Sequence, residues 1–196
     1  MEVWKEIALD GERGAQRLVA EFGDRLLNAA VQITQNYADA EDLVFRTFTQ
    51  VIKKISQYDG RSAFFTWIYR ILVNFRRMDL RKKGVNTLVY MDELPETEDL
   101  APDPAEVFAL LSSAEEVRLA VGRLAEPLRE VIVFRYFEDM DVSEIARVLS
   151  IPVGTVKYRL FEARRQLARS LTQTRISHLS GRGQDEEDGQ IRYVHS

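Results

Sequence analysis

Two groups of basic and aromatic side chains have the types and spacing that nucleic-acid binding requires. The first lies in Tyr58–Lys83, and the overlapping stretch Lys53–Lys83 holds nine Lys or Arg residues against two Asp or Glu. Cations can bind the backbone of a single DNA strand, and flat rings can stack on its bases. The alternative is that Phe64, Trp67 and Phe75 are core residues, and helical periodicity favours the core for these three.

The second group lies in Val142–Arg169, where six Lys or Arg residues face only two Glu in a chain of formal net charge −4. Its polar and aromatic members are Thr155, Lys157, Tyr158, Arg159, Arg164 and Arg165. An apolar stripe of Val156, Leu160, Ala163 and Leu167 occupies one side of the predicted helix. Tyr158 and Arg165, with Phe161, lie opposite the stripe, and Lys157, Arg164, Thr155 and Arg159 flank them, so the set should form the outer face. A basic helix face of this kind suits the DNA major groove, although a helical hairpin with a solvated charged face would show the same spacing.

Composition argues against several other classes of protein. The chain has no Cys, and its two His residues, His178 and His195, are isolated near the C-terminal end. No phosphate loop or nucleophile set is recognisable, so we expect neither an enzyme nor a bound cofactor or metal. No apolar run approaches the roughly 18 residues that a membrane helix needs, and we expect a cytoplasmic protein.

The second group is positioned by two short helices joined by a tight turn. Asp141 can cap the first helix together with Glu144, at the spacing of a capping box. Pro and Gly within Ser150–Gly154 interrupt the helical period, and a second helix follows. This is the layout of a helix-turn-helix whose second helix enters the major groove.

Apolar residues at helical spacing predict helices through the rest of the chain as well. The expected segments are Ala15–Gln35, Asp39–Gln57, a helix capped by Ser62 after a turn at Tyr58–Arg61, Ala114–Leu124 and Pro127–Glu138. Leu128, Val131, Ile132, Phe134 and Phe137 are predicted to support the helix-turn-helix as core residues. The fold class is therefore all-α.

An acidic segment divides the chain. Gly84–Val117 holds nine Asp or Glu and no Lys or Arg, with three Pro. We expect a domain at residues 1–83, a flexible acidic linker at 84–112, a helix-turn-helix domain at 113–171 and a flexible polar tail at 172–196. About 28 linker residues reach some 90–100 Å when extended, more than the roughly 70 Å between sites two DNA turns apart.

Three segments resemble the extracytoplasmic-function (ECF) group of bacterial sigma factors: DAEDLVFRTF at 39–48, the stretch from Tyr58 to Asn74, and IPVGTVKYRLFEARRQL at 151–167. The resemblance implies a partner, core RNA polymerase, and a second partner, an anti-sigma factor. It implies polymerase docking through Asp39, Asp42, Arg46, Thr49, Gln50 and Lys53. It implies that Tyr58, Arg61, Ser62, Phe65, Arg70, Asn74 and Arg77 melt the downstream promoter element and hold a base flipped from it. The helix-turn-helix face at Thr155, Lys157, Tyr158, Arg159, Arg164 and Arg165 would read the upstream element as duplex DNA.

Some positions depart from the family pattern, and other functions compete with this one. Arg46 stands where an acidic residue is usual, Ser150 where Gly is common, Tyr158 where a small polar residue is usual, and Leu72 in place of Ala. One alternative is a sigma mimic that sequesters an anti-sigma factor without reading DNA. Another is a repressor that binds duplex DNA alone, although the Tyr58–Lys83 pattern would then have no purpose.

Overall fold

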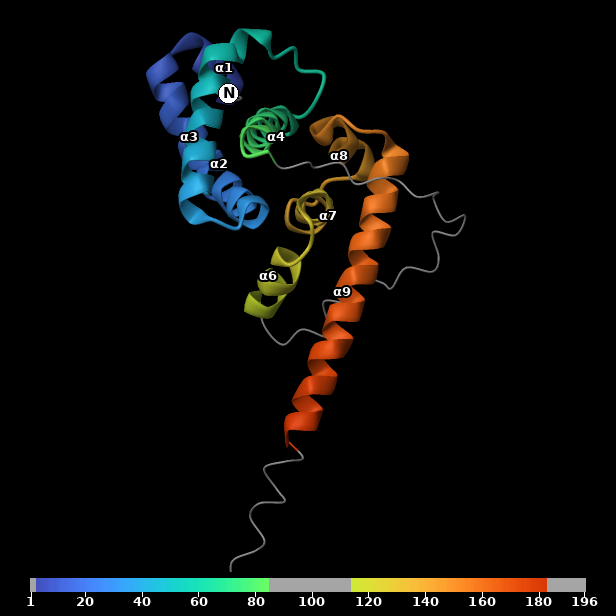
Figure 1. The fold of residues 1–196 in the computed structure, drawn as a ribbon. Coiled ribbons are helices and arrows are strands. Elements are labelled where there is room, and N and C mark those ends of the chain that lie inside the picture. The colour runs from blue at the N-terminus through green and yellow to red at the C-terminus, as the bar shows by residue number, and fades with distance from the viewer. Residues whose placement is uncertain (1–2, 85–113, 183–196) are drawn as a thin grey trace, which may run out of the picture.

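The computed structural model describes residues 3–84 and 114–182, which form two groups of helices that we call the N-lobe and the C-lobe (Figure 1). The N-lobe contains α1 (Val3–Leu9), α2 (Gly11–Thr34), α3 (Tyr37–Lys54), the 3₁₀ turn η1 (Ile55–Gln57) and α4 (Phe64–Lys82). The C-lobe contains α6 (Ala114–Gly122), α7 (Glu126–Ile132), the π-helical segment η3 (Val133–Phe137), α8 (Val142–Leu149) and α9 (Val153–Arg182). The predicted all-α class with two helical units is confirmed.

In the N-lobe, α2, α3 and α4 pack their apolar stripes together, with Leu26, Leu43 and Leu72 fully buried. The sharp reversal between α2 and α3 has a local cause. Gln35 ends α2 in the left-handed conformation, and the Asn36 side chain then accepts a hydrogen bond from the Asp39 backbone N–H at 2.9 Å. The reversal therefore places the start of α3 beside the end of α2, and α3 returns antiparallel to it.

In the C-lobe, the predicted helix-turn-helix is confirmed as α8 and α9. Asp141 and Glu144 form the capping box at the start of α8, and Ser150 ends this helix at φ 51°. Pro127 lies in the first turn of α7, as predicted. The helix α9 continues to Arg182, whereas the sequence suggested a tail from Thr172 onward. Residues 183–196, with His195, lie outside the described residues.

The two lobes pack directly on each other and share one continuous core. α4 lies against α8, and α2 contacts α6, α7 and η3. At the centre, the Tyr69 ring of α4 meets the Phe134 ring of η3 edge-on, with centroids 5.2 Å apart. The acidic linker 84–112, from Val85 onward, lies outside the described residues.

The structure corrects three details of the sequence analysis. Ala63, not Ser62, is the N-cap of α4, and no side chain caps this helix. Phe137 is 41% exposed and is not a core residue. Helical period places Thr66, Tyr69 and Val73 on the same basic face of α4 as the expected site residues Arg70 and Arg77, but all three are buried, because the C-lobe covers this part of the helix.

Candidate nucleic-acid interface

The residues expected at the downstream promoter element lie along α4 and the turn before it. Arg70 and Asn74 are exposed and Arg77 is half-buried, so α4 retains an accessible polar edge. Phe65 is also half-buried, and the Arg25 guanidinium lies over its ring at 4.0 Å. Arg70, Asn74 and Arg77 share one side of α4 by helical period, whereas Phe65 lies on the other side of the helix, where it packs against Phe22 and Tyr69.

The turn before α4 contains two hydrogen bonds of its own. The Tyr58 hydroxyl donates to the Ser62 carbonyl at 2.6 Å, and the Arg61 backbone N–H donates to the Asp59 carboxylate at 3.0 Å. Gly60 has φ +73°, a conformation that favours glycine. The predicted turn around Asp59 and Gly60 is confirmed, and it leaves the Arg61 side chain 88% exposed.

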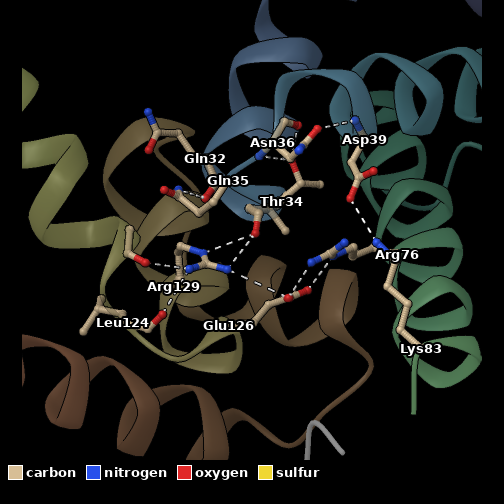
Figure 2. Close-up of polar contacts among 12 residues, drawn as sticks. Gln32, Thr34, Gln35, Asn36, Asp39, Arg76, Lys83, Leu124, Glu126 and Arg129 are labelled. Carbon is tan, nitrogen blue, oxygen red and sulfur yellow. Dashed lines mark hydrogen bonds and ion pairs between the residues drawn. The ribbon is translucent and has the colours of Figure 1, made fainter. Parts of the chain in front are cut away.

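One more basic residue of α4, Arg76, forms an ion pair with the C-lobe. The Arg76 guanidinium donates two hydrogen bonds to the Glu126 carboxylate of α7, at 2.8 and 2.7 Å, and both side chains are nearly buried (Figure 2). Desolvation lowers the pKa of Arg76, but the Glu126 carboxylate more than offsets this and the pKa stays raised. A bidentate pair of this kind fixes orientation as well as contributing energy.

Two further arginines join the lobes. Arg129 of α7 donates to the Ile33 carbonyl at the end of α2, at 3.2 and 2.9 Å, and to the Gly122 and Leu124 carbonyls of its own lobe (Figure 2). Burial lowers the pKa of Arg129. Arg25 of α2 donates to the Glu138 carboxylate at 2.6 Å and to the Glu138 carbonyl at 2.9 Å. The lobes are thus joined by a polar seam, which consists of Arg25, Arg76 and Arg129 with their partners.

The residues expected at the upstream element divide into two sets on α9. Lys157 and Arg165 are exposed, Tyr158 and Arg164 are half-buried, and all four lie within three turns of the helix. Arg165 donates to the Glu162 carboxylate at 2.8 and 2.9 Å. Thr155 and Arg159 are buried, at 7% and 9% exposure, contrary to their expected place on the outer face. Arg159 faces Glu130 and Arg77, and burial lowers its pKa.

The residues expected to dock on polymerase share the outer side of α3, where Thr49 and Gln50 are half-buried and Lys53 is exposed. Arg46, the unusual residue of this set, contacts Asp79 of α4 at 2.5 Å and Asp42 at 2.8 Å. Hydrogen bonding to Arg46 holds the pKa of Asp79 below its usual range, although burial acts in the opposite direction. The Lys83 ammonium forms an ion pair with the Asp39 carboxylate, with Nζ and Oδ2 3.1 Å apart. Arg46 and Asp39 therefore also tie α3 to α4.

Sequence reasoning missed the residues that join the lobes. The sequence analysis did not assign a function to Arg25, Glu126, Arg129 or Glu138. A signal was present in Glu126–Ile132, where charged residues interrupt a helix that was predicted to be largely apolar. Glu130 of that helix is 5% exposed, and burial raises its pKa to about 7. Within residues 3–84 and 114–182, no cluster of side chains could hold a metal ion and no helix could span a membrane.

Together, a helix-turn-helix with a cationic outer face and a second lobe with an aromatic and basic helix define a DNA-binding protein of two helical units. Comparison with known families identifies those units. Residues 18–85 match the model for sigma-70 region 2, and residues 114–167 match the model for sigma-70 region 4.

Several curated bacterial proteins are similar over most of their length. The chain is 30% identical to the ECF RNA polymerase sigma factor SigW of Bacillus subtilis over 166 residues, which cover 79% of this chain and 87% of the relative. It is 34% identical to the ECF RNA polymerase sigma-E factor of Escherichia coli over 142 residues, which cover 64% and 70%. The chain therefore belongs to the ECF group of the sigma-70 family, and the resemblance noted in its sequence is confirmed.

Two solved structures have a similar fold. One is CnrH in complex with the cytosolic domain of CnrY, with a TM-score of 0.62, 26% identity, and coverage of 87% of this chain and 95% of that one. The other is the sigma factor RpoE of Bartonella quintana in complex with the anti-sigma factor NepR. Its TM-score is 0.60 at 20% identity, with coverage of 81% and 96%.

Proposed function

We propose that this sigma factor directs core RNA polymerase to promoters by reading two elements, and that its lobes must separate before it does so. The observation that carries the second part is the burial of Thr66, Tyr69 and Arg76 of α4 under the C-lobe. These residues lie on the helix assigned to the downstream element. A promoter strand cannot reach that part of α4 while the lobes are packed together.

The residues assigned to the upstream element also indicate that the lobes must separate. Arg159 of α9 is buried next to Glu130 and close to Arg77 of α4, so part of the basic helix lies toward the N-lobe. Separation would expose Arg76, Arg77 and Arg159 together and would leave each lobe with more positive surface for phosphates. Each phosphate neutralised by such a cation releases a counterion, so promoter binding should weaken steeply with salt.

The protein supplies placement and strand opening, and no covalent step is assigned to its residues. In the downstream element, Tyr58, Arg61, Ser62, Phe65, Arg70, Asn74 and Arg77 would hold the opened strand. An extruded base costs a few kcal/mol, which stacking and hydrogen bonds in the protein must offset. In the upstream element, Lys157, Tyr158, Arg164 and Arg165 would contact duplex DNA. Arg159, which lies close to Arg77 of α4, would contribute after the lobes separate, whereas Thr155 is buried and is not assigned a DNA contact.

Core polymerase is the partner that would hold the separated lobes in line. Docking is assigned to the outer side of α3, with Asp42, Thr49, Gln50 and Lys53 available and with Asp39 and Arg46 shared with α4. The protein would act in the cytoplasm with polymerase. An anti-sigma factor is expected as a second partner, because a free sigma factor must be silenced until it is needed.

Run-off transcription with purified core polymerase on genomic fragments tests this function. We expect transcripts that start at specific sites only when the protein is added, and footprints that cover both promoter elements. If the protein alone protects duplex DNA as well as the holoenzyme does, the repressor alternative is favoured. If no promoter-specific transcript is formed, the proposed function is wrong.

A further inference from the structure

A cavity of about 530 Å³ lies where α1, α2 and the turn before α4 meet. Three of its lining residues, Tyr58, Arg61 and Ser62, belong to the set assigned to the downstream element. The others were not assigned to any function. They include Trp4 of α1, Arg17, Glu21 and Phe22 of α2, and Phe64 at the start of α4.

Four aromatic rings lie among the lining residues of this cavity, together with charged and polar groups. The Trp4 ring meets the Tyr58 ring edge-on, with centroids 5.5 Å apart, and Tyr58 meets Phe64 in the same manner at 5.1 Å. Phe22 meets Phe64 from the α2 side at 5.9 Å. Rings from three separate helices and from the turn thus converge on one space, which an unstacked planar ligand could fill.

The helix α1 is a fixed part of this wall. Ile7 is buried against Gly14 of α2 so closely that a side chain at position 14 would collide with the Ile7 backbone. Arg17 of α2 donates to the Glu6 carboxylate at 2.5 Å. One apolar contact and one ion pair therefore set the position of α1, and with it the position of Trp4.

The polar lining is suited to the edge of a base. Among the residues that the structure describes, the Glu21 carboxylate has one long contact, 3.7 Å to Arg17, while Arg17 makes its short ion pair with Glu6. The Glu21 carboxylate can therefore accept a hydrogen bond from a ligand, and a carboxylate accepts from the exocyclic amino group of cytosine or adenine. Thymine offers no such amino group.

We propose that α1 completes the pocket for an unstacked base of the downstream promoter element, with Trp4 as an aromatic wall and Glu21 as the acceptor for an amino-bearing base. This inference rests on the proposed function, and it assigns a role to a helix outside the segment that matches sigma-70 region 2. Trp4 and Glu21 are residues that contact the base, whereas Gly14 acts by positioning α1.

Binding of the holoenzyme to a forked promoter probe with a single-stranded downstream element tests the pocket. The probe is compared with copies that carry an abasic site at each single-stranded position in turn. Trp4→Ala should weaken binding to the intact probe about ten-fold, because one stacking contact is lost. At one abasic position the wild type and Trp4→Ala should bind equally, since the ring has no base to contact. Trp4→Phe should recover most of the affinity.

Substitutions at two glycines of α2 distinguish an effect on the position of α1 from an effect on the stability of α2. Gly14→Ala should reproduce the loss caused by Trp4→Ala, because the new methyl group displaces α1. Gly11→Ala, in the first turn of the same helix, meets nothing within 4 Å and should bind like the wild type. Glu21→Gln should reduce the preference for an amino-bearing base at the sensitive position, because the amide can also donate a hydrogen bond.

The inference is overturned if Trp4→Ala binds the intact probe as tightly as the wild type, or if the same loss persists at every abasic position. It is also overturned if Gly14→Ala and Gly11→Ala behave alike. These outcomes are distinct from failure of the proposed function, in which the wild-type holoenzyme itself would not bind the promoter probe specifically.

Discussion

The Arg76 guanidinium of α4 and the Glu126 carboxylate of α7 form a bidentate ion pair that is nearly closed to solvent, with side chains 9% and 13% exposed. Arg76 belongs to the N-lobe and Glu126 to the C-lobe. Because Arg76 belongs to the basic segment that favoured nucleic-acid binding, the same cation can bind a carboxylate in the packed form and a phosphate after separation.

Removal of the Glu126 carboxylate should release the lobes. Glu126→Ala leaves the Arg76 charge in a buried site without its partner, which costs about 3–5 kcal/mol. Exposure of Arg76 to water relieves that cost, so we expect a larger radius of gyration in small-angle X-ray scattering and faster proteolysis between the lobes. Glu12→Ala, at an exposed position of α2, is the matched control and should change neither measurement. An unchanged radius of gyration for Glu126→Ala would contradict this account of the seam.

The buried Glu130 carboxyl should make stability depend on pH near neutrality. Burial raises its pKa to about 7 from 4.5, although nearby Arg77, Arg159 and Arg76 favour the charged form and Glu126 opposes it. A raised pKa means that the folded state binds the proton more tightly than the unfolded chain. The stabilisation is therefore complete below pH 4.5 and is lost as the pH rises through 7.

Urea unfolding at several pH values checks this effect. Between pH 5 and 7 the wild type should lose up to about 1.4 kcal/mol of unfolding free energy per pH unit through this group. Glu130→Gln, which stays neutral, should show a flatter profile over the same range. If both proteins had parallel profiles, Glu130 would not be the group responsible.

Local patterns predicted most of the helices from the sequence, but not α1 or the extension of α9 from Thr172 to Arg182. The capping box of Asp141 and Glu144, the turn at Asp59 and Gly60, and the stripe of Val156, Leu160 and Ala163 all depend on residues close together in the chain. The roles of α8 and α9 as a helix-turn-helix followed from the same short-range information. The family resemblance then identified both lobes.

The contact between the lobes could not be predicted in this way. It depends on pairs such as Tyr69 with Phe134 and Arg25 with Glu138, which are far apart in the sequence and have no periodic pattern. The acidic composition of the linker favoured separated domains. Thr155 and Arg159 were expected on the outer face of their helix from its period. Their burial is a property of packing that the helical period does not contain.

The left-handed conformation of Ser150 gives a local test of the helix-turn-helix. This residue has φ 51° at the end of α8, where a side chain costs about 1 kcal/mol relative to glycine. Ser150→Gly should therefore raise the free energy of unfolding by about 1 kcal/mol. Ser143→Gly, in the helical first turn of α8, should instead lower it by about 0.5 kcal/mol. Urea unfolding measures both, and two changes of the same sign would argue against the strain at Ser150.

Exposed cations of α9 should contribute to binding at the upstream element. Arg165→Ala and Lys157→Ala are each expected to weaken holoenzyme binding to a promoter and to reduce the slope of log affinity against log salt by about 1. Arg13→Ala removes a charge that is 80% exposed on α2, away from α9, and should leave the slope unchanged. Binding to polymerase should be unaffected by all three. Normal initiation by both α9 variants would refute the assignment of this helix face.

Asn74 on the exposed edge of α4 should affect opening of the DNA more than initial binding. Its side-chain amide can both donate and accept hydrogen bonds, so it can contact the edge of a base that has left the duplex. Such contacts do not exist before the strands separate. Asn74→Ala should therefore slow the formation of permanganate-reactive open complexes while leaving closed-complex affinity within about two-fold, since roughly 0.4 kcal/mol corresponds to that ratio. Gln16→Ala removes a similar amide from an exposed position on α2 and should alter neither step. Equal losses in closed-complex affinity and in opening would show that Asn74 acts before melting, and its assignment to the opened strand would then be wrong.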